Sequence, residues 1–167
     1  MENDLEKSVN LVWRQKKDLV SMLTDRDRCN EIYRVGYDSC WSNREIPTEV
    51  TSYVDTLTKS SSLNKNSQIL DLGCGSGRLL EYLEARGFTK VVGVDVSDTA
   101  VKFAKSRLQT PEVALVDVKN GLPFPDNTFD LVAELTFVSS LNPRLWPAIF
   151  KEIKRVLRNN GHFISEI

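Results

Sequence analysis

The pattern of hydrophobic and polar positions divides the chain into two parts. From residue 68 onward, short apolar runs alternate with segments whose apolar positions recur at helical spacing. The runs predict strands at residues 68–72, 90–96, 112–118, 129–135 and 162–167, and the segments between them predict helices at residues 78–87, 97–109 and 144–161. Such alternation predicts an α/β domain, in which right-handed crossovers wind a mostly parallel sheet in both directions and helices cover both of its faces.

The first part of the chain has a different pattern. Helical spacing in residues 5–23 and in residues 47–60 predicts two amphipathic helices. Between them, a charged break at residues 24–30 is followed by residues 31–47, which hold aromatic side chains without a sustained period and predict an ordered loop. These elements predict helices that precede the sheet.

Length and composition favour a single domain. With 167 residues, 41% of them hydrophobic, the chain can bury one core, so we expect residues 1–62 to form a helical cap packed on a core of residues 63–167. A net charge of −1 argues against nucleic acid as a partner, and no apolar run reaches the roughly 20 residues of a membrane span. The polar N-terminus is unlike a signal peptide. Three widely spaced cysteines and one histidine argue against a disulfide framework or a metal site, which favours a cytoplasmic, intracellular location.

A glycine-dense turn follows the first predicted strand. Gly73, Gly75 and Gly77 stand at alternate positions, and Asp71 precedes them. Glycine lets the backbone take positive φ and approach a ligand closely, although a tight strand-to-helix turn would use it too. The dinucleotide fingerprint would need a further glycine where Arg78 stands, and no phosphate-loop lysine follows. The turn therefore favours a ligand without phosphates and with an amine-bearing end.

Acidic residues fall at or near the carboxyl ends of four predicted strands: Asp71, Asp95, Asp117 and Glu134. In an open parallel sheet these ends share one rim, where ligands bind at the switch point. We therefore expect the four acids to converge on one site.

Several segments, in this order, resemble the class I S-adenosylmethionine-dependent methyltransferases. The stretch "LDLGCGSG" resembles the first motif of that family, "VVGVDVS" the second and "VALVDV" the third. The segments "GLPFPDNTFDLV" and "EIKRVLRNNGHFISEI" resemble the regions of its fourth and fifth strands. The resemblance implies a Rossmann-like fold and S-adenosylmethionine as the cofactor, with S-adenosylhomocysteine as the product.

The resemblance also implies residue roles. It places the cofactor against Asp71, Gly73, Cys74, Gly75, Gly77, Asp95, Val96, Asp117, Val118 and Glu134. Asp71 would meet the methionine amino group, and Asp95 would accept both ribose hydroxyls. Asp117 and the backbone of Val118 would meet the adenine. Cys74 is interpreted as the small residue that close approach requires rather than as a nucleophile.

The implied activity is methyl transfer to a small molecule or a protein. The cofactor supplies the reactivity, so no dedicated catalytic side chain is needed, and Glu134 is a weak candidate if the acceptor must lose a proton. The place of the nucleic-acid amino-methylating signature reads "AELTFVSSLNP", which argues against base amines. Tyr37 and Trp41 either fold over the cofactor or the acceptor, or pack the N-terminal helices.

The resemblance stops early. The family sheet has seven strands, whereas this sequence ends at Ile167, in or just after the fifth. A bare apolar edge promotes pairing. We expect a shortened form, an edge covered by the N-terminal segment, or an edge paired in a homodimer or with a partner subunit. The alternative function is therefore a cofactor-binding but inactive subunit or regulator that a partner chain completes.

Overall fold

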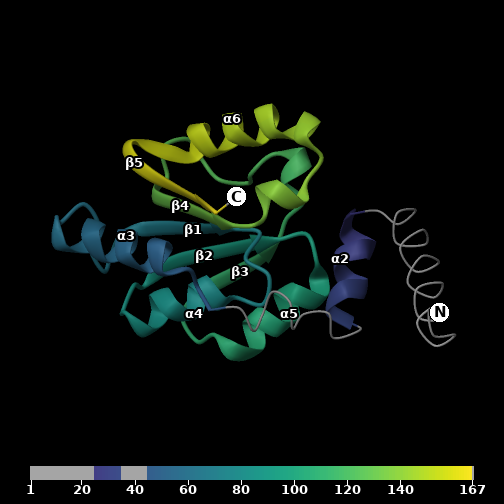
Figure 1. Ribbon diagram of the computed structural model, residues 1–167, viewed down its shortest axis with the longest axis horizontal. Helices are drawn as coiled ribbons and strands as arrows, with labels where there is room; N and C mark the ends of the chain where they lie inside the picture. Colours follow the sequence, from purple (N-terminus) through teal and green to yellow (C-terminus); the bar gives the residue numbers. More distant parts are fainter. Residues whose placement is uncertain (1–24, 35–44, 167) are drawn as a thin grey trace, which may run out of the picture.

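A parallel sheet organises the part of the chain that the computed structural model describes, which is residues 25–34 and 45–166 (Figure 1). Its strands are β1 (Gln68–Leu72), β2 (Lys90–Asp95), β3 (Glu112–Leu115), β4 (Phe129–Leu135) and β5 (Leu157–Glu166). Their spatial order is β3-β2-β1-β4-β5, and every neighbouring pair is parallel. Leu70 lies opposite Val92 on one side and Val132 on the other, so β1 is central and the winding reverses there. The predicted doubly wound fold is confirmed.

Helices cover both faces of the sheet (Figure 1). One face packs against α3 (Thr48–Lys59), α4 (Arg78–Ala85) and α5 (Asp98–Arg107), and the other packs against α6 (Trp146–Val156). Because side chains alternate along a strand, Ile69 belongs to the first core and Leu70 to the second. Short 3₁₀ turns η2 (Val118–Asn120), η3 (Val138–Ser140) and η4 (Pro143–Leu145) complete the second face.

A helix replaces part of the predicted charged break and loop. Residues 25–34 form α2 (Asp25–Arg34), so the prediction of irregular structure over this stretch was wrong. The helix lies beside α5 (Figure 1), where the Asn30 side chain accepts a 2.7 Å hydrogen bond from the Ser97 hydroxyl, and Arg26 lies 3.8 Å from Asp98. Tertiary contacts thus stabilise a segment whose polar sequence carries too short an apolar pattern to reveal a helix.

Three predicted boundaries also differ from the observed ones. Helix α6 ends at Val156 rather than near Gly161, because the loop before β4 bonds its last turn: the N–H of Asn127 donates to Arg155 O and that of Thr128 to Val156 O. Strand β5 then begins at Leu157, opposite Phe129. Strand β3 ends at Leu115, three residues before the predicted end. Pairing with neighbours, not local sequence, sets these ends.

Strands β3 and β5 are the two edges of the sheet among the described residues. None of the helices in this part of the chain is both long enough and apolar enough to cross a membrane. The predicted helix at residues 5–23 and the aromatic residues Tyr37 and Trp41 lie outside the described residues.

Candidate cofactor site

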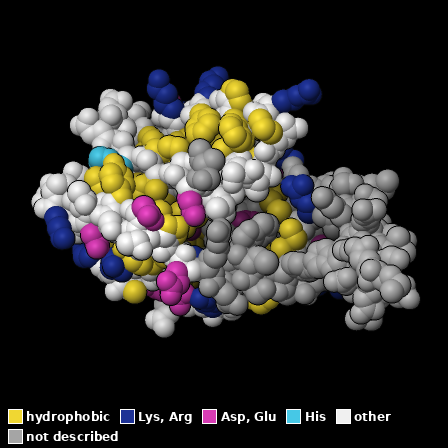
Figure 2. Space-filling model, viewed as in Figure 1, with side chains coloured by type: hydrophobic (Ala, Val, Ile, Leu, Met, Phe, Trp, Pro, Cys, Tyr) yellow, Lys and Arg dark blue, Asp and Glu magenta, His cyan; other side chains and the backbone are white. Residues whose placement is uncertain are grey.

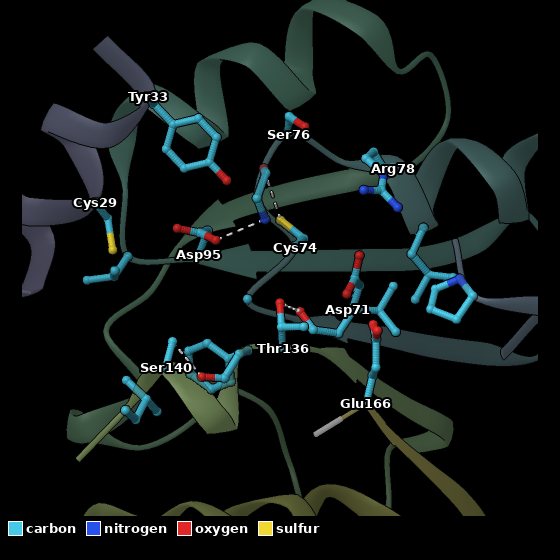
Figure 3. A pocket seen from close by; sticks show the side chains of 18 of the residues that line it. Cys29, Tyr33, Asp71, Cys74, Ser76, Arg78, Asp95, Thr136, Ser140 and Glu166 are labelled. Atoms are coloured by element: carbon cyan, nitrogen blue, oxygen red, sulfur yellow. Dashed lines mark hydrogen bonds between the residues drawn. The ribbon is translucent and has the colours of Figure 1, made fainter. Parts of the chain in front are cut away.

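A cavity of about 350 Å³ opens at the carboxyl ends of β1, β2 and β4 (Figure 3). The glycine turn after β1 forms one wall, the corner after β4 forms another, and α2 contributes Tyr33. Asp71 and Asp95 both line it. This is the switch point of the winding, where an open parallel sheet binds its ligands.

The glycine turn needs glycine for both conformation and space. Gly73, Gly75 and Gly77 have φ of +75°, +54° and +85°, which side chains with a Cβ rarely adopt. A Cβ on Gly73 would lie 2.5 Å from the Phe137 ring, and one on Gly75 would lie 2.5 Å from the Tyr33 hydroxyl. Only Gly73 and Gly75 line the cavity. The turn therefore exposes backbone at two positions.

Gly77 has a different environment from the other two glycines. It precedes α4, and a Cβ there would lie 3.0 Å from Leu108 and 3.1 Å from Ala104 of α5. Gly77 therefore allows α4 to pack closely against α5, and it does not line the cavity.

Asp71 is a buried carboxyl that faces the cavity from the end of β1 (Figure 3). Within the described residues, no side chain or backbone group donates a hydrogen bond to it. Burial, together with the charges of Asp95 and Glu134, raises its pKa to about 8, although the charge of Arg78 acts against the rise. A buried carboxyl in this state would gain most from a cationic ligand, because a nearby positive charge restores its ionised form.

Asp95 ends β2 and holds the turn in place. One carboxylate oxygen accepts a hydrogen bond from the Gly75 N–H at 2.9 Å, and the other accepts from the Ser97 N–H at 2.8 Å. Burial raises the pKa of Asp95, while these backbone donors and Val96 act against the rise. Each oxygen keeps a second lone pair for a hydroxyl donor.

A smaller crevice of about 20 Å³ lies beyond Asp95 and shares Gly73, Asp95, Val96, Phe137 and Leu141 with the main cavity. Asp117 and Val118 line it. The Asp117 side chain accepts from the Lys119 N–H at 3.1 Å and caps η2. This volume has room for roughly one water, so a nucleobase would have to widen the crevice.

Cys74 and Glu134 differ in their relation to the cavity. Cys74 lines it, and burial raises the pKa of its thiol well above the ordinary value, which disfavours a thiolate nucleophile. Glu134 lines neither cavity. Its side chain is completely buried and accepts hydrogen bonds from the Val138 N–H at 3.0 Å and from the Ser165 hydroxyl.

Several residues that line the cavity were not predicted from the sequence. They are Arg28, Cys29 and Tyr33 of α2, together with Arg78, Thr136, Phe137, Ser140 and Glu166. The signal for α2 was weak: Cys29 and Tyr33 stand four residues apart, which places them on one helical face. No periodic pattern or motif in the sequence indicates Phe137, because it lies in a short polar turn after the strand.

A family model described as "Methyltransferase domain" matches residues 70–165. The chain belongs to this family. A solved structure of an S-adenosylmethionine-dependent methyltransferase from Methanosarcina mazei is 27% identical with a TM-score of 0.58, covering 64% of this chain and 55% of that one. The predicted resemblance to S-adenosylmethionine-dependent methyltransferases is confirmed, and membership implies S-adenosylmethionine as the cofactor.

Curated relatives of this methyltransferase-family chain are longer proteins. Human "Arginine-hydroxylase NDUFAF5, mitochondrial" is 34% identical over 96 residues, which are 58% of this chain and 27% of that protein. The Schizosaccharomyces pombe "Uncharacterized methyltransferase C70.08c" is 31% identical over 137 residues, covering 75% of this chain and 50% of that protein. The chain thus spans half or less of the length of these two relatives.

Proposed function

We propose that the chain transfers a methyl group from S-adenosylmethionine to a small-molecule or protein acceptor and releases S-adenosylhomocysteine. One observation carries the proposal. Asp71 is a buried carboxyl that faces the cavity beside the glycine turn, and within the described residues no hydrogen bond reaches it. An ammonium group is the ligand that such a carboxyl suits best, and the methionine end of the cofactor carries one.

The two cavities would take the two ends of the cofactor. Asp71 and Arg78 lie on the same side of the main cavity (Figure 3), so the amino-acid end would meet one acid and one base. The backbone of Gly73, Cys74 and Gly75, which all line the cavity, would pass beneath it. These contacts would orient the methionine moiety by charge on one side and by close backbone approach on the other.

The adenosine end would lie toward the smaller crevice. Asp95 would accept the ribose hydroxyls, because its oxygens are already held by backbone donors and keep free lone pairs. Val96, Asp117 and Val118 line the crevice that would take the adenine. Phe137 lines both spaces and would stand at their junction.

The chain's own contribution to transfer would be alignment and exclusion of water. S-adenosylmethionine supplies an activated methyl group when bound, so the protein need not generate a reactive species. Tyr33 of α2 is buried beside Gly75 of the glycine turn and lines the cavity, as does Leu135 of β4, and both side chains would exclude water from the bound methyl group. Holding acceptor and methyl group in line is the main catalytic demand on such a site.

Glu134 does not support the role of base that the sequence suggested for it. Both of its oxygens already accept hydrogen bonds, from Val138 and from Ser165, and it lines neither cavity. A base must come within hydrogen-bond reach of the proton that it removes. A role in shaping the site fits these contacts better.

The alternative is a cofactor-binding chain that a partner completes. Strand β5 is an edge among the described residues, and hydrophobic side chains gather over α6 beside it (Figure 2), where Phe150 is 37% exposed and stacks edge-to-face on Phe163 at 6.1 Å. A homodimer or a partner subunit at this edge would cover both features. We also propose a cytoplasmic location for either form, because the three cysteines of the sequence are odd in number and widely spaced.

Isothermal calorimetry with S-adenosylmethionine and S-adenosylhomocysteine tests the proposal, with light scattering on the same sample. We expect micromolar binding of both compounds and a large loss of affinity in Asp71→Ala. Asp55→Ala, an exposed acid on α3, is the control and should bind as the parent does. Absence of binding by a folded, monodisperse protein would refute the proposal.

A second assay separates the two functions. Labelled methyl groups from S-adenosylmethionine are followed into a cell extract that has been divided into small-molecule and protein fractions. Label in either fraction that depends on Asp71 supports transfer. The alternative is supported if the chain binds the cofactor but transfers no label, and if adding a co-purifying subunit restores the transfer.

A further inference from the structure

Glu134 is a completely buried carboxyl at the end of β4. Its Oε2 accepts from the backbone N–H of Val138 at 3.0 Å, and its Oε1 accepts from the hydroxyl of Ser165 on β5. A buried acid is costly unless its oxygens are hydrogen-bonded. The cost is met here by two donors, one of which is the first residue of η3.

The corner that Glu134 spans has a strained backbone. Thr136 has φ of +61°, a conformation that residues with a β-branched side chain rarely adopt. The turn directs the next residue, Phe137, against the glycine turn, where its ring and Cβ occupy the space that a Cβ on Gly73 would need. A strained corner of this kind persists only where surrounding contacts determine it.

Both backbone polar groups of Val138 form hydrogen bonds with side chains. Its N–H donates to Glu134, and its carbonyl accepts from the indole Nε1–H of Trp146 at 3.0 Å. Its side chain is fully buried among the α6 core residues. The backbone that follows Phe137 is therefore fixed by one hydrogen bond to β4 and one to α6. These bonds restrict the position of the Phe137 Cα, from which the ring extends.

The position of Phe137 decides the boundary between the two cavities. Phe137 and Leu141 line both the main cavity and the crevice beside Asp117. The crevice has a volume of about 20 Å³, so a displacement of this corner would close it or open it to an adenine. Whatever fixes the corner therefore sets the fit of the adenosine.

We propose that Glu134 is a positioning residue: by holding Val138 it keeps Phe137 at the junction of the two cavities and thereby sets the affinity for the adenosine part of the ligand. The inference rests on the proposed function, since it concerns the same site. It assigns Glu134 no contact with the cofactor and no proton transfer.

Three variants test the assignment by calorimetry with S-adenosylhomocysteine. Glu134→Ala removes both acceptors, and we expect at least a tenfold loss of affinity. Glu134→Gln keeps an oxygen for the Val138 N–H and offers its amide to Ser165 Oγ, so it should stay within threefold of the parent. Leu57→Ala, which removes buried packing from α3 on the other face, is the control for general destabilisation and should keep its affinity.

Amide hydrogen exchange supplies a readout that does not depend on any ligand. The Val138 amide should exchange at least tenfold faster in Glu134→Ala than in the parent, while Leu70 in β1 keeps its protection. Should Glu134→Ala fail to fold, Ser165→Ala removes one of the two donors to Glu134 and should make the Val138 amide exchange faster than it does in the parent.

Parent-like affinity of Glu134→Ala would overturn the inference, as would equal losses in Glu134→Gln and Glu134→Ala, which would show that the charge itself is required. Failure of the parent to bind any cofactor would refute the proposed function, and the inference with it. Slow exchange of Val138 in Glu134→Ala would refute the inference alone.

Discussion

The carboxylate of Asp95 accepts a hydrogen bond from the backbone N–H of Gly75 at 2.9 Å, which joins the end of β2 to the glycine turn after β1. Its other oxygen accepts from the Ser97 N–H at the start of α5. One side chain thus fixes three segments at the rim of the sheet. A carboxylate held in this way is oriented before a ligand arrives, so little ordering remains to be done on binding.

Asp95→Ala should weaken cofactor binding strongly. Each hydrogen bond from a ribose hydroxyl to the carboxylate would contribute about 1.5–3 kcal/mol, and the turn would lose its anchor as well. Calorimetry with S-adenosylhomocysteine measures the loss, and Asp55→Ala on the exposed side of α3 serves as the control. Equal affinities of Asp95→Ala and the control would show that the ribose lies elsewhere.

Asp71 should make cofactor binding depend on pH. Burial raises its pKa to about 8, so the carboxyl is mostly protonated at pH 7 in the free protein. An ammonium group beside it would lower that pKa and release up to about one proton per bound cofactor. Calorimetry at pH 7 in buffers of different ionisation enthalpy counts the protons. Asp71→Asn should release no proton from this position on binding. If the parent also releases no proton, Asp71 is not protonated in the free protein.

Asp71 should also lower the stability of the free protein at higher pH. Its pKa is raised above the ordinary value of 3.8, so the folded state holds a proton that the unfolded state has lost. The free energy of unfolding therefore falls as pH rises from about 4 to about 8. Asp71→Asn should remove that part of the fall and be more stable than the parent at pH 8 by about 1–3 kcal/mol. Urea titrations at pH 5 and pH 8 measure it, and a parallel pH dependence in both proteins would argue against a buried acid.

The α2 helix should depend on Asn30 for its position. The Asn30 side chain accepts from the Ser97 hydroxyl at 2.7 Å, and Ser97 Oγ in turn accepts from the Ala100 N–H to cap α5. Asn30→Ala should weaken the docking of α2 on α5 by about 1 kcal/mol of free energy. Amide hydrogen exchange should become faster throughout residues 25–34. Arg34→Ala, which removes an ion pair with Glu31 of the same helix, is the control. Unchanged exchange in Asn30→Ala would mean that other contacts hold α2.

Arg155 should be the main polar anchor of the loop before β4. Its guanidinium donates to the Leu122 and Phe124 carbonyls and to the Asp126 and Glu152 carboxylates. We expect Arg155→Met to lower the free energy of unfolding by about 1–3 kcal/mol at pH 7, since two part-buried carbonyls would lose their donor. Arg158→Met, which removes an exposed pair with Asp130, should cost at most about 1 kcal/mol.

The same network should weaken in acid. The Arg155 hydrogen bond, with the Leu122 N–H, lowers the pKa of Glu152 from 4.5 to about 2. A depressed pKa contributes stability above the unfolded value, and that contribution is lost as pH falls from about 4.5 to about 2. The parent should therefore lose more stability over this window than Arg155→Met does, as chemical denaturation would measure. Identical acid profiles would contradict the role of Glu152.

Local pattern sufficed where an element is long or strongly periodic. Strand β1 forms at residues 68–72 as predicted, because an apolar run before three alternate glycines leaves few alternatives. The place of Asp95 at the end of β2 followed from the same logic. By contrast, α2 is polar, and its docking on α5 depends on Asn30 and Ser97, which are 67 positions apart. No local window contains that contact.

By itself the sequence determined the order of strands and helices, the glycine turn and the acids at the rim, because periodicity and backbone freedom are local properties. Only the tertiary structure decided which of those acids share the cavity. It brought Asp71 and Asp95 into it and directed Glu134 into the core between β4 and β5. The physical reason is that the direction and burial of a side chain depend on what packs around it, and those neighbours come from distant parts of the chain.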